Sequence, residues 1–518
     1  MTASAPQFVG MLVACGAGAT ALLARDPRLR YAAAAVALIA APALVLGDVW
    51  DTSRVVSLRH PPEKLAALCV AAVIAAALVA AIFRRFDWAF PIAAFAVLPL
   101  RVPVTVGGQT SHLLVPLYLV IAGGVLSFGY AALRGPRTRD DGAPPVNAAT
   151  PGPPLVTWLY RVLAATLVLY AIQSIYSDDV SNAIENASFF LVPFALLFAM
   201  FGEVRWSDRL LAWILVTVTA VALVFAGVAF WEYAARDLFL SKGDLLASNQ
   251  LHLYFRVNSL FYDPNILGRD LALVLVALGA YLAWARSRRL AMAAAAAAGI
   301  LLAALALSYS ITGFVALVAG LLVVLALRWG LRWAIVAGVA IVVAAAIFSA
   351  VSGVGRTDLS STDKINEASA GRVSLITGGY DLTRDRPIYG WGSGSFGKAF
   401  KDHVDRHAQT TVSHSEPLTV GAEQGAIGLV VYAALIVLSL LVLLPGARES
   451  LAATAVAACF IALFVHSLGY ADFSVDPAMW ALLGVGVALR LRRRVGAGVP
   501  APEPAGDAAA RDPRPATA

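Results

Sequence analysis

The sequence has few charged residues and few cysteines, and each shortage excludes a class of protein. Only 14% of its 518 residues are Asp, Glu, Lys or Arg, whereas 60% are hydrophobic and the mean hydropathy is +0.76. Soluble domains carry about 25% charged residues, so this composition excludes an ordinary soluble fold. Cys15, Cys69 and Cys459 all fall in apolar stretches without CxxC spacing, which indicates neither a disulfide framework nor a zinc site.

Motifs for metal and nucleotide binding are also missing. No Gly-Lys-Ser/Thr follows the glycine-rich run at 387–397 and no strand is predicted before it, so a phosphate-binding loop is disfavoured. There is no HExxH pattern. His403 and His407 have the i,i+4 spacing of a metal-binding pair, but their context is typical of an exposed helix or loop. We therefore expect neither a metal nor a cofactor.

Long apolar stretches make up most of the chain. About fifteen of them approach or reach the length that crosses the hydrocarbon core of a bilayer. They predict an all-α, polytopic transmembrane helix bundle of about 12–15 spans with one large extracytoplasmic loop. The predicted spans are 8–24, 31–47, 65–83, 87–100, 112–133, 155–174, 184–202, 210–231, 266–285, 290–308, 313–328, 334–351, 425–444, 451–468 and 478–490.

Basic residues in the short connections predict how the bundle is oriented. Loops rich in Lys and Arg stay on the cytoplasmic side, which also accounts for the net charge of +7 without nucleic-acid binding. The cytoplasmic runs are RDPRLR (25–30), FRR (83–85), GPRTR (135–139), RSRR (286–289), RWGLRW (328–333) and RLRRR (490–494). This assignment places 48–64, 101–111, 232–265 and 352–424 outside, in a multi-pass protein of the inner (plasma) membrane.

Changes in composition along the chain predict its domains. Residues 1–134 form an N-terminal transmembrane bundle, and the Pro/Gly-rich stretch 135–154 is a cytoplasmic linker. Residues 155–490 form the main transmembrane domain, which contains the outer loop 352–424. The Ala/Pro/Gly-rich end of the chain, 491–518, is expected to be a disordered cytoplasmic tail.

The first polar segment on the outer side begins at Arg256. Asp263 can cap the helix that follows, and Asn265 lies in its first turn. Arg269 and Asp270 lie one turn inside an apolar span. The simpler interpretation is an interfacial cap with a snorkelling arginine; the alternative is a polar pocket in which a buried arginine needs an anionic partner. Because Asp270 is adjacent and can neutralise Arg269, Arg256 is the better candidate for a ligand contact.

The second polar segment, 371–428, lies between two apolar spans. Arg372 opens an amphipathic helix, and the glycine-rich run that contains Tyr389 predicts a tight backbone bend. His414 ends the loop and precedes a helix that carries Glu416 and Glu423. A single histidine at an interface more often caps or packs than reacts. A neutral histidine at this place is, however, a suitable base for a hydroxyl nucleophile.

Six blocks in a fixed order resemble the O-antigen ligase and polymerase superfamily. They occupy roughly 250–480, between predicted spans, whereas the N-terminal half is similar to that superfamily only in hydropathy. The blocks are RVNSLFYDPN (256–265), LSYSITG (307–313), GR (371–372), PIYGWGSGSF (387–396), HSEPLTVGAEQGAIGL (414–429) and HSLGYADFSVDP (466–477).

The resemblance implies a membrane glycosyltransferase of the C type, with 155–490 as its catalytic domain. Such enzymes move a glycan from an undecaprenyl-diphosphate carrier to a hydroxyl of a glycan, lipid or protein acceptor on the outer face, without metal or nucleotide. The superfamily's functional arginines fall on Arg256 and Arg372 and its histidine falls on His414. Arginine can hold a diphosphate leaving group through bidentate, charge-assisted hydrogen bonds.

Further substrate contacts are expected from the same blocks. The residues expected to bind substrate are Arg269, Asn265, Glu423 and Tyr389.

The chain departs from the superfamily pattern at two places. Where a Ser-Arg-x-Gly block is usual, it has Ser310-Ile311-Thr312-Gly313, which removes one positive charge, and the usual His-Asn is His414-Ser415. Two other functions stay open: a transporter or flippase of lipid-linked or small solutes, and a non-catalytic scaffold for envelope assembly. The outer position of the polar residues and the lack of a visible repeat disfavour a transporter. The sequence does not choose between ligase and polymerase.

Overall fold

The computed structural model describes residues 3–106, 109–134, 153–240, 245–246, 249–250, 254–352, 372–406, 408 and 413–496. Within these residues, eleven helices are long and apolar enough to cross a membrane. Two shorter apolar helices, Leu331–Ile347 and Leu451–Ser467, accompany them. The prediction of an all-α polytopic bundle is confirmed, and the chain is a multi-pass membrane protein.

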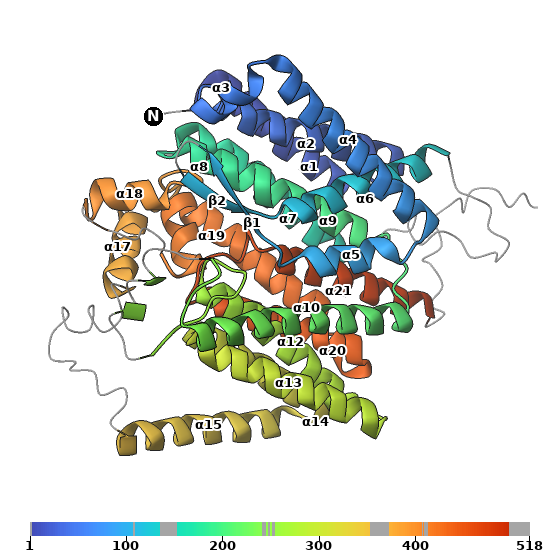
Figure 1. Cartoon of the computed structure of the whole chain (residues 1–518), viewed down its shortest axis with the longest axis vertical. Helices are drawn as coiled ribbons and strands as arrows, with labels where there is room; N and C mark the ends of the chain where they lie inside the picture. The colour runs from blue at the N-terminus through green and yellow to red at the C-terminus, as the bar shows by residue number, and fades with distance from the viewer. Residues whose placement is uncertain are drawn as a thin grey trace, which may run out of the picture.

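Many of the helices follow one another through connections of a few residues, whereas longer stretches separate α6 from α7, α10 from α12 and α15 from α17 (Figure 1). Those of the N-terminal part are α1 (Ala5–Leu23), α2 (Pro27–Asp48), α3 (Ser53–Arg59), α4 (Pro62–Arg85), α5 (Ala89–Val97) and α6 (Val115–Arg134). The middle of the chain forms α7 (Pro154–Gln173), α8 (Val180–Glu185), a π-helical turn (Asn186–Leu191), α9 (Val192–Phe201), α10 (Asp208–Ala235), α12 (Pro264–Trp284), α13 (Arg288–Ser308), α14 (Ile311–Trp329) and α15 (Leu331–Ser352). The last part forms α17 (Arg372–Asp385), α18 (Phe396–His403), α19 (Glu416–Leu443), α20 (Leu451–Ser467) and α21 (Pro477–Gly496).

Side-chain caps mark where several spans begin. The carboxylate of Asp263 accepts a hydrogen bond from the backbone N–H of Asn265, and Pro264 takes the first position of α12. Ser287 and Ser310 cap α13 and α14 in the same way. Each cap satisfies one of the N–H groups that a helix start leaves without an intrahelical partner.

One predicted span is too short to cross a membrane. The apolar run 87–100 forms only the nine-residue helix α5. At 1.5 Å per residue this helix covers about 14 Å, roughly half of the hydrocarbon core. The chain then enters a two-stranded antiparallel hairpin, β1 (Val102–Val106) and β2 (Gln109–Leu113), in which Val102 pairs with Leu113. The prediction of a span at 87–100 was therefore wrong.

Most of the predicted N-terminal bundle shares one hydrophobic core with later helices. Phe90 packs edge-to-face on Phe201 of α9, and Phe198 of α9 packs in the same way on Trp480 of α21. These residues belong to one continuous buried cluster. A second cluster joins α10, α12, α13, α14 and α20. The division of the chain at 134 and 155 stays a prediction, and the linker at 135–152 lies outside the described residues.

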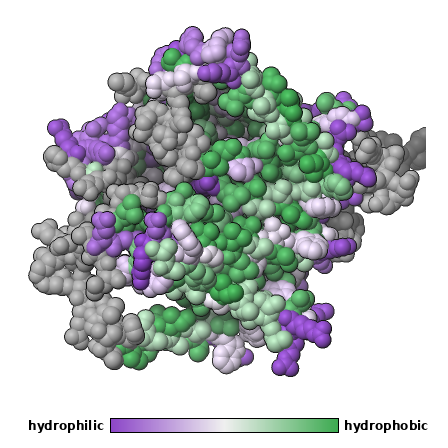
Figure 2. Space-filling view, in the orientation of Figure 1, coloured by the Kyte–Doolittle hydropathy of each residue, from purple (hydrophilic) through white to green (hydrophobic). Residues whose placement is uncertain are grey.

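The connections gather at two ends of the bundle. The end that carries 236–263, 309–310, 386–415 and 468–476 is called the loop side here, and it lies at the left of Figure 1 with α17 and α18. The opposite end carries Arg30, Arg328 and Arg492, which belong to three of the predicted basic runs. Figure 2 shows a broad hydrophobic face across the helices, with hydrophilic residues gathered toward its margins, as expected for a protein embedded in lipid. Residues 353–371 of the predicted outer loop and 497–518 of the predicted tail lie outside the described residues.

Candidate functional site

Arg269 is buried in the second turn of α12 among three aspartates. It is 2% exposed, and its Nε donates to Asp270 at 3.2 Å. Its Nη1 contacts the carboxylates of Asp472 and Asp476, which lie between α20 and α21. The expected pairing with Asp270 is present, together with two partners from a distant block. Because three carboxylates surround one guanidinium, Arg269 has little positive field left for a diphosphate.

Burial also shifts the titration of this cluster toward neutral pH. Burial raises the pKa of the Asp472 carboxyl to about 7, although the charge of Arg269 opposes this shift. The charges of Arg269 and of Arg101 favour the ionised carboxylates, but the desolvation of several buried charges outweighs them. The Arg269 cluster, defined as Arg269 with Asp270, Asp472 and Asp476, is thus a compensated structural joint between α12 and the connection 468–476.

A row of hydrogen bonds runs from Asn265 to His466. The hydroxyl of Ser310 donates to Oδ1 of Asn265 at 3.1 Å and lies 3.4 Å from the hydroxyl of Thr312. The Thr312 hydroxyl in turn lies 3.2 Å from Nε2 of the fully buried His466. Ile311, where the superfamily's arginine is expected, is 72% exposed. Its side chain therefore points away from this row.

His414 lies at the same end of the bundle. Its backbone has a φ of 54°, and its half-buried ring has its centroid 6.1 Å from that of Tyr470. The Tyr470 hydroxyl donates to the Asp263 carboxylate at 3.1 Å, and the Tyr470 ring also lies 5.6 Å from the His466 ring. Tyr470 therefore links His414 to the start of α12 and to the row that ends at His466.

The structure describes the side chain of only one of the two other arginines expected in the site. Arg256 is half-buried, and its Nε donates to the carbonyl of Ser308 at 3.2 Å. Its backbone N–H is held by the side chain of Asn249. Arg256 thus adjoins the Asn265 row through the end of α13. Arg372 is the first residue of α17, but its side chain lies outside what the structure describes.

The glycine-rich turn fits into a break in α19. Gly425 has φ 62° and ψ −158°, which is not helical. Backbone N–H groups of Trp391 and Gly392 donate to the carbonyls of Ala422 and Glu423 just before the break. A Cβ on Gly392 would lie 2.3 Å from the Cα of Ser177, so only glycine fits there. The predicted tight bend is present.

The same break is bridged on its far side. Ala426 and Ile427 donate their N–H groups to the carbonyls of Pro387 and Ile388. Tyr389 lies between these two sets of bonds; its ring is 52% exposed, and its carbonyl accepts from the hydroxyl of Tyr176 at 2.7 Å. Tyr389 is therefore placed near the end of α7, separate from the Arg269 cluster.

Glu423 holds the end of the glycine-rich turn. One carboxylate oxygen accepts from the N–H of Gly394 at 2.8 Å and the other from the N–H of Phe396 at 3.1 Å. Glu416 does the same for the connection after α20: it accepts from the N–H groups of Phe473 and Ser474 and from the Ser474 hydroxyl. Each buried glutamate fixes a loop-side segment to α19.

A third buried glutamate works in the same way on the first polar segment. Glu232 of α10 is fully buried, and its carboxylate accepts from the N–H groups of Phe239, Asn258 and Ser259 at 2.7–3.0 Å. The segment that contains Arg256 is thereby fixed to α10. Loops held this way keep their side chains in defined positions.

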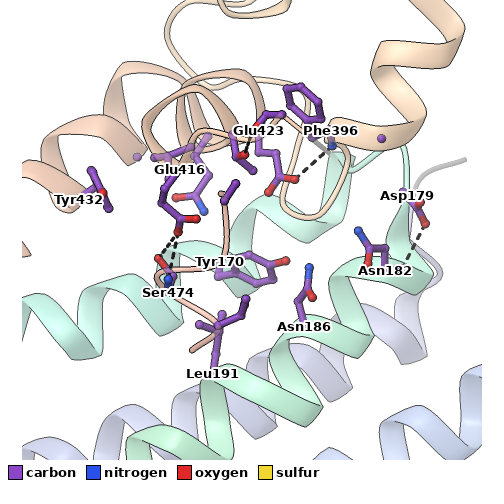
Figure 3. A pocket seen from close by; sticks show the side chains of 18 of the residues that line it. Tyr170, Asp179, Asn182, Asn186, Leu191, Phe396, Glu416, Glu423, Tyr432 and Ser474 are labelled. Atoms are coloured by element: carbon purple, nitrogen blue, oxygen red, sulfur yellow. Dashed lines mark hydrogen bonds between the residues drawn. The ribbon is translucent and has the colours of Figure 1, made fainter. Parts of the chain in front are cut away.

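A cavity of about 710 Å³ lies between α7, α8, α18, α19 and the connection 471–475. Figure 3 shows side chains from these elements directed into it. Among its lining residues are Tyr170, Asn182, Asn186, Glu416, Glu423 and Ser474. Glu423 and Glu416 thus both clamp loops and face this cavity.

The cavity and the Arg269 cluster are neighbours along two segments. Ser413 and Glu416 line the cavity, and His414 between them is beside Tyr470. Likewise Ala471 lines the cavity next to Tyr470. The segments 413–416 and 470–474, called the divider here, thus border the cavity and carry His414 and Tyr470. Tyr470 in turn contacts Asp263 at the start of α12, the helix of Asn265 and Arg269, whereas Glu423 faces the cavity.

The sequence did not predict that Tyr470 lies beside His414 or that Asp472 and Asp476 contact Arg269, although all three belong to the block 466–477. Sequence reasoning also missed Tyr170 and Asn186, which lie in apolar spans on the wall of the cavity. A polar residue inside a predicted span is the signal that could have found them, because such residues are costly in lipid unless they face the protein interior or water.

Comparison with known proteins yields one family. Residues 296–433 match the family model of the O-antigen ligase domain. This range contains most of α13, all of α14, α15, α17 and α18, and α19 as far as Ala433, with Arg372, His414 and Glu423. A search of curated proteins finds no match. The resemblance to the O-antigen ligase and polymerase superfamily is confirmed, and at the family level it supports a ligase- or polymerase-like membrane glycosyltransferase.

Proposed function

We propose that this chain, which carries an O-antigen ligase domain, moves a glycan from an undecaprenyl-diphosphate carrier to an acceptor hydroxyl on the outer face of the plasma membrane. The observation that carries the proposal is the position of His414. It lies inside the matched domain, its ring is beside Tyr470, and Ser413 just before it and Glu416 two residues after it line the cavity. A base at this position is next to a space that can hold a substrate.

The reaction is a displacement at the first sugar of the donor. The acceptor oxygen attacks the anomeric carbon, the bond from that carbon to the diphosphate oxygen breaks, and the polyprenyl diphosphate leaves with the electron pair. His414 takes the hydroxyl proton, because a neutral imidazole is basic enough at physiological pH. Tyr470, held by Asp263, orients the His414 ring.

Arginine side chains hold the leaving group in this mechanism. Arg256 is half-buried at the loop side, where its guanidinium can meet a diphosphate at the membrane surface. Arg372 begins α17 on the same side. Their positive charge stabilises the negative charge that grows on the departing diphosphate. Arg269 and Asn265 act on the substrate indirectly, since the first is compensated by three aspartates and the second is bonded to Ser310.

No metal or nucleotide takes part in this scheme. The arginines supply the charge that a divalent cation supplies in other glycosyltransferases, and the carrier diphosphate already activates the sugar. Purified protein in lipid nanodiscs should therefore transfer glycan in excess EDTA and without ATP. If Mg²⁺ or Mn²⁺ were needed to restore transfer, the scheme would be wrong.

A deletion strain tests the function as a whole. Loss of surface polymer with accumulation of lipid-linked polymer indicates a ligase, whereas accumulation of single lipid-linked repeat units indicates a polymerase. Wild-type protein from a plasmid should restore the surface glycan, and His414→Ala at equal membrane level should not. Unchanged surface and lipid-linked glycans in the deletion strain would contradict the proposal.

A further inference from the structure

The cavity beside His414 has the size and the lining of a carbohydrate site. Its volume of about 710 Å³ lies within the range of ligand pockets, roughly 300–1,000 Å³. Its walls carry amide groups from Asn182, Asn186 and Gln424 and hydroxyl groups from Tyr170 and Ser474. Amides and hydroxyls both donate and accept hydrogen bonds, which is what the hydroxyls of a sugar require.

One of these groups makes no well-formed hydrogen bond. Tyr170 is only 6% exposed, and the approach of its hydroxyl to the Asn186 side chain falls short of good hydrogen-bond geometry. Figure 3 shows this ring between Asn186 and the glutamates of α19, at the level of the cavity. A buried hydroxyl whose hydrogen bond is incomplete costs free energy. A ligand hydroxyl in the cavity would relieve this cost.

The charge of the lining argues against a phosphate. Asp179, Glu185, Glu416 and Glu423 all face the cavity, and no arginine is among the described residues that line it. Its two lysines, Lys398 and Lys401, are exposed at the edge; one of them donates to a backbone carbonyl. A diphosphate would meet acidic groups in this space, whereas an uncharged sugar would not be repelled.

The wall also contains an irregular helix. Asn186 begins the π-helical turn Asn186–Leu191 between α8 and α9. Such turns place side chains away from the positions of a regular α-helix and are frequent at functional sites. Ser181 and Asn182, one turn nearer the loop side, are exposed, and Glu185 and Asn186 are half-buried. The cavity therefore has an accessible mouth and a buried floor.

We propose that this cavity binds uncharged sugar units of the glycan, while the diphosphate of the donor stays on the His414 and Arg256 side of the divider formed by 413–416 and 470–474. This inference rests on the proposed function and assigns the sugar-binding part of the same site. The sugar units come either from the donor glycan or from the acceptor, and the same groups serve both.

The test uses full-length protein in nanodiscs and the glycans of its own cell. Mild acid releases free glycan from the lipid-linked fraction of the deletion strain, and a second sample is taken from the envelope. Saturation-transfer NMR measures binding of each to wild type, Tyr170→Phe, Asn186→Ala and Ser181→Trp. The last variant fills the exposed mouth and leaves the buried floor intact.

We expect Tyr170→Phe and Asn186→Ala to weaken glycan binding about three- to tenfold, the loss of one or two hydrogen bonds. Ser181→Trp should abolish it. The matched control is Tyr118→Phe, which removes another buried tyrosine hydroxyl, on α6 and outside the lining of the cavity. The inference is overturned if all three cavity variants bind glycan as wild type does. It is also overturned if wild type binds no glycan.

Transfer kinetics then identify the source of the sugar. If Tyr170→Phe and Asn186→Ala raise KM only for the acceptor, the cavity holds acceptor sugars; if they raise KM only for the lipid-linked donor, it holds donor sugars. Glycan binding that depends on the cavity, together with no transfer by wild type, would contradict the proposed function and leave the sugar site standing. Normal transfer by wild type, together with glycan binding that the cavity variants do not change, would contradict the sugar site and leave the proposed function standing.

Discussion

Arg269 and Asp472 are in direct contact, although 203 residues separate them in the sequence. The contact ties the second turn of α12 to the connection between α20 and α21. With Asp270 and Asp476 on the same guanidinium, this joint fixes the wall on which Tyr470 and His414 lie. The site therefore depends on a charge balance that is not itself part of the reaction.

Removal of the arginine should destabilise the protein strongly. Arg269→Leu leaves the carboxylates of the cluster buried without a counterion, so the free energy of unfolding should fall by about 3–5 kcal/mol. Thermal unfolding in detergent and the amount of protein in membranes measure this. Asp472→Asn should cost much less and should partly rescue the arginine variant. If Arg269→Leu were as stable as wild type and yet inactive, Arg269 would contact the substrate.

Stability should depend on pH through Asp472. Its pKa is raised to about 7 by burial, whereas an unfolded aspartate titrates near 3.9. Between these values the folded protein binds a proton that the unfolded chain has lost, so stability is highest at the acidic end and falls as pH rises to about 7. Unfolding temperatures from pH 5 to pH 8 measure the effect. Asp472→Asn should flatten the profile; an identical profile in that variant would assign the proton elsewhere.

Loss of the proposed base should stop transfer and spare donor binding. His414→Ala should lower kcat by about 10²–10⁴-fold, the usual contribution of a general base. Lipid-linked donor should still bind, since the base acts on the acceptor. Turnover and donor affinity of the purified variant measure the two effects separately. Near-normal turnover would move the role to another group, with Glu416 and Glu423 next in line.

The two proposed diphosphate ligands should behave differently from the base. Arg256→Ala and Arg372→Ala should weaken donor binding and lower turnover, because they meet the diphosphate before and during the reaction. Lysine at either position should restore only part of the activity, since it keeps the charge and loses the planar fork. Arg384→Ala is the control: this exposed arginine lies in the last turn of α17. Equal damage from the control would mean that α17 acts only as a general basic surface.

A methyl group in the glycine-rich turn should disturb its packing. Gly392 has a φ of 99°, and its Cβ would lie 2.3 Å from the backbone of Ser177. Gly392→Ala should therefore cost more than about 2 kcal/mol. Gly299→Ala in α13, where a Cβ meets nothing within 4 Å, should instead be neutral or slightly stabilising. Similar unfolding temperatures for the two variants would contradict the tight packing.

Hydropathy predicts most of the helices, because the membrane requires each span to be long and apolar. The predicted span 290–308 differs from α13 by two residues at one end. The same criterion fails at 87–100, since it counts apolar residues and does not detect that the chain leaves the helix after Val97 for an extended hairpin. The length of an apolar run is not the length of the helix.

The candidate site is less predictable, because its contacts join distant blocks. Asp270 could be assigned to Arg269 as a neighbour in sequence, but the contacts of Arg269 with Asp472 and Asp476 follow from the packing of α12 against α20. For the same reason Glu423, expected to bind substrate, also clamps Gly394 and Phe396. Local sequence patterns therefore predict which polar residues belong to the site, but the contacts between them depend on tertiary packing, which the patterns do not give.

The break in α19 has a consequence for motion. A gap in a transmembrane helix exposes backbone groups that lipid cannot satisfy, and here the segment 387–392 fills it by bonding to both sides of Gly425. This part of the loop therefore supplies the backbone hydrogen bonds that a regular turn of the helix would make. It cannot swing aside as a lid without leaving N–H and C=O groups bare, so its amide hydrogens should exchange as slowly as those of the bundle core. Faster exchange in 387–392 than in the bundle core would show that this segment leaves the break, and the wall next to Glu423 would then not be fixed.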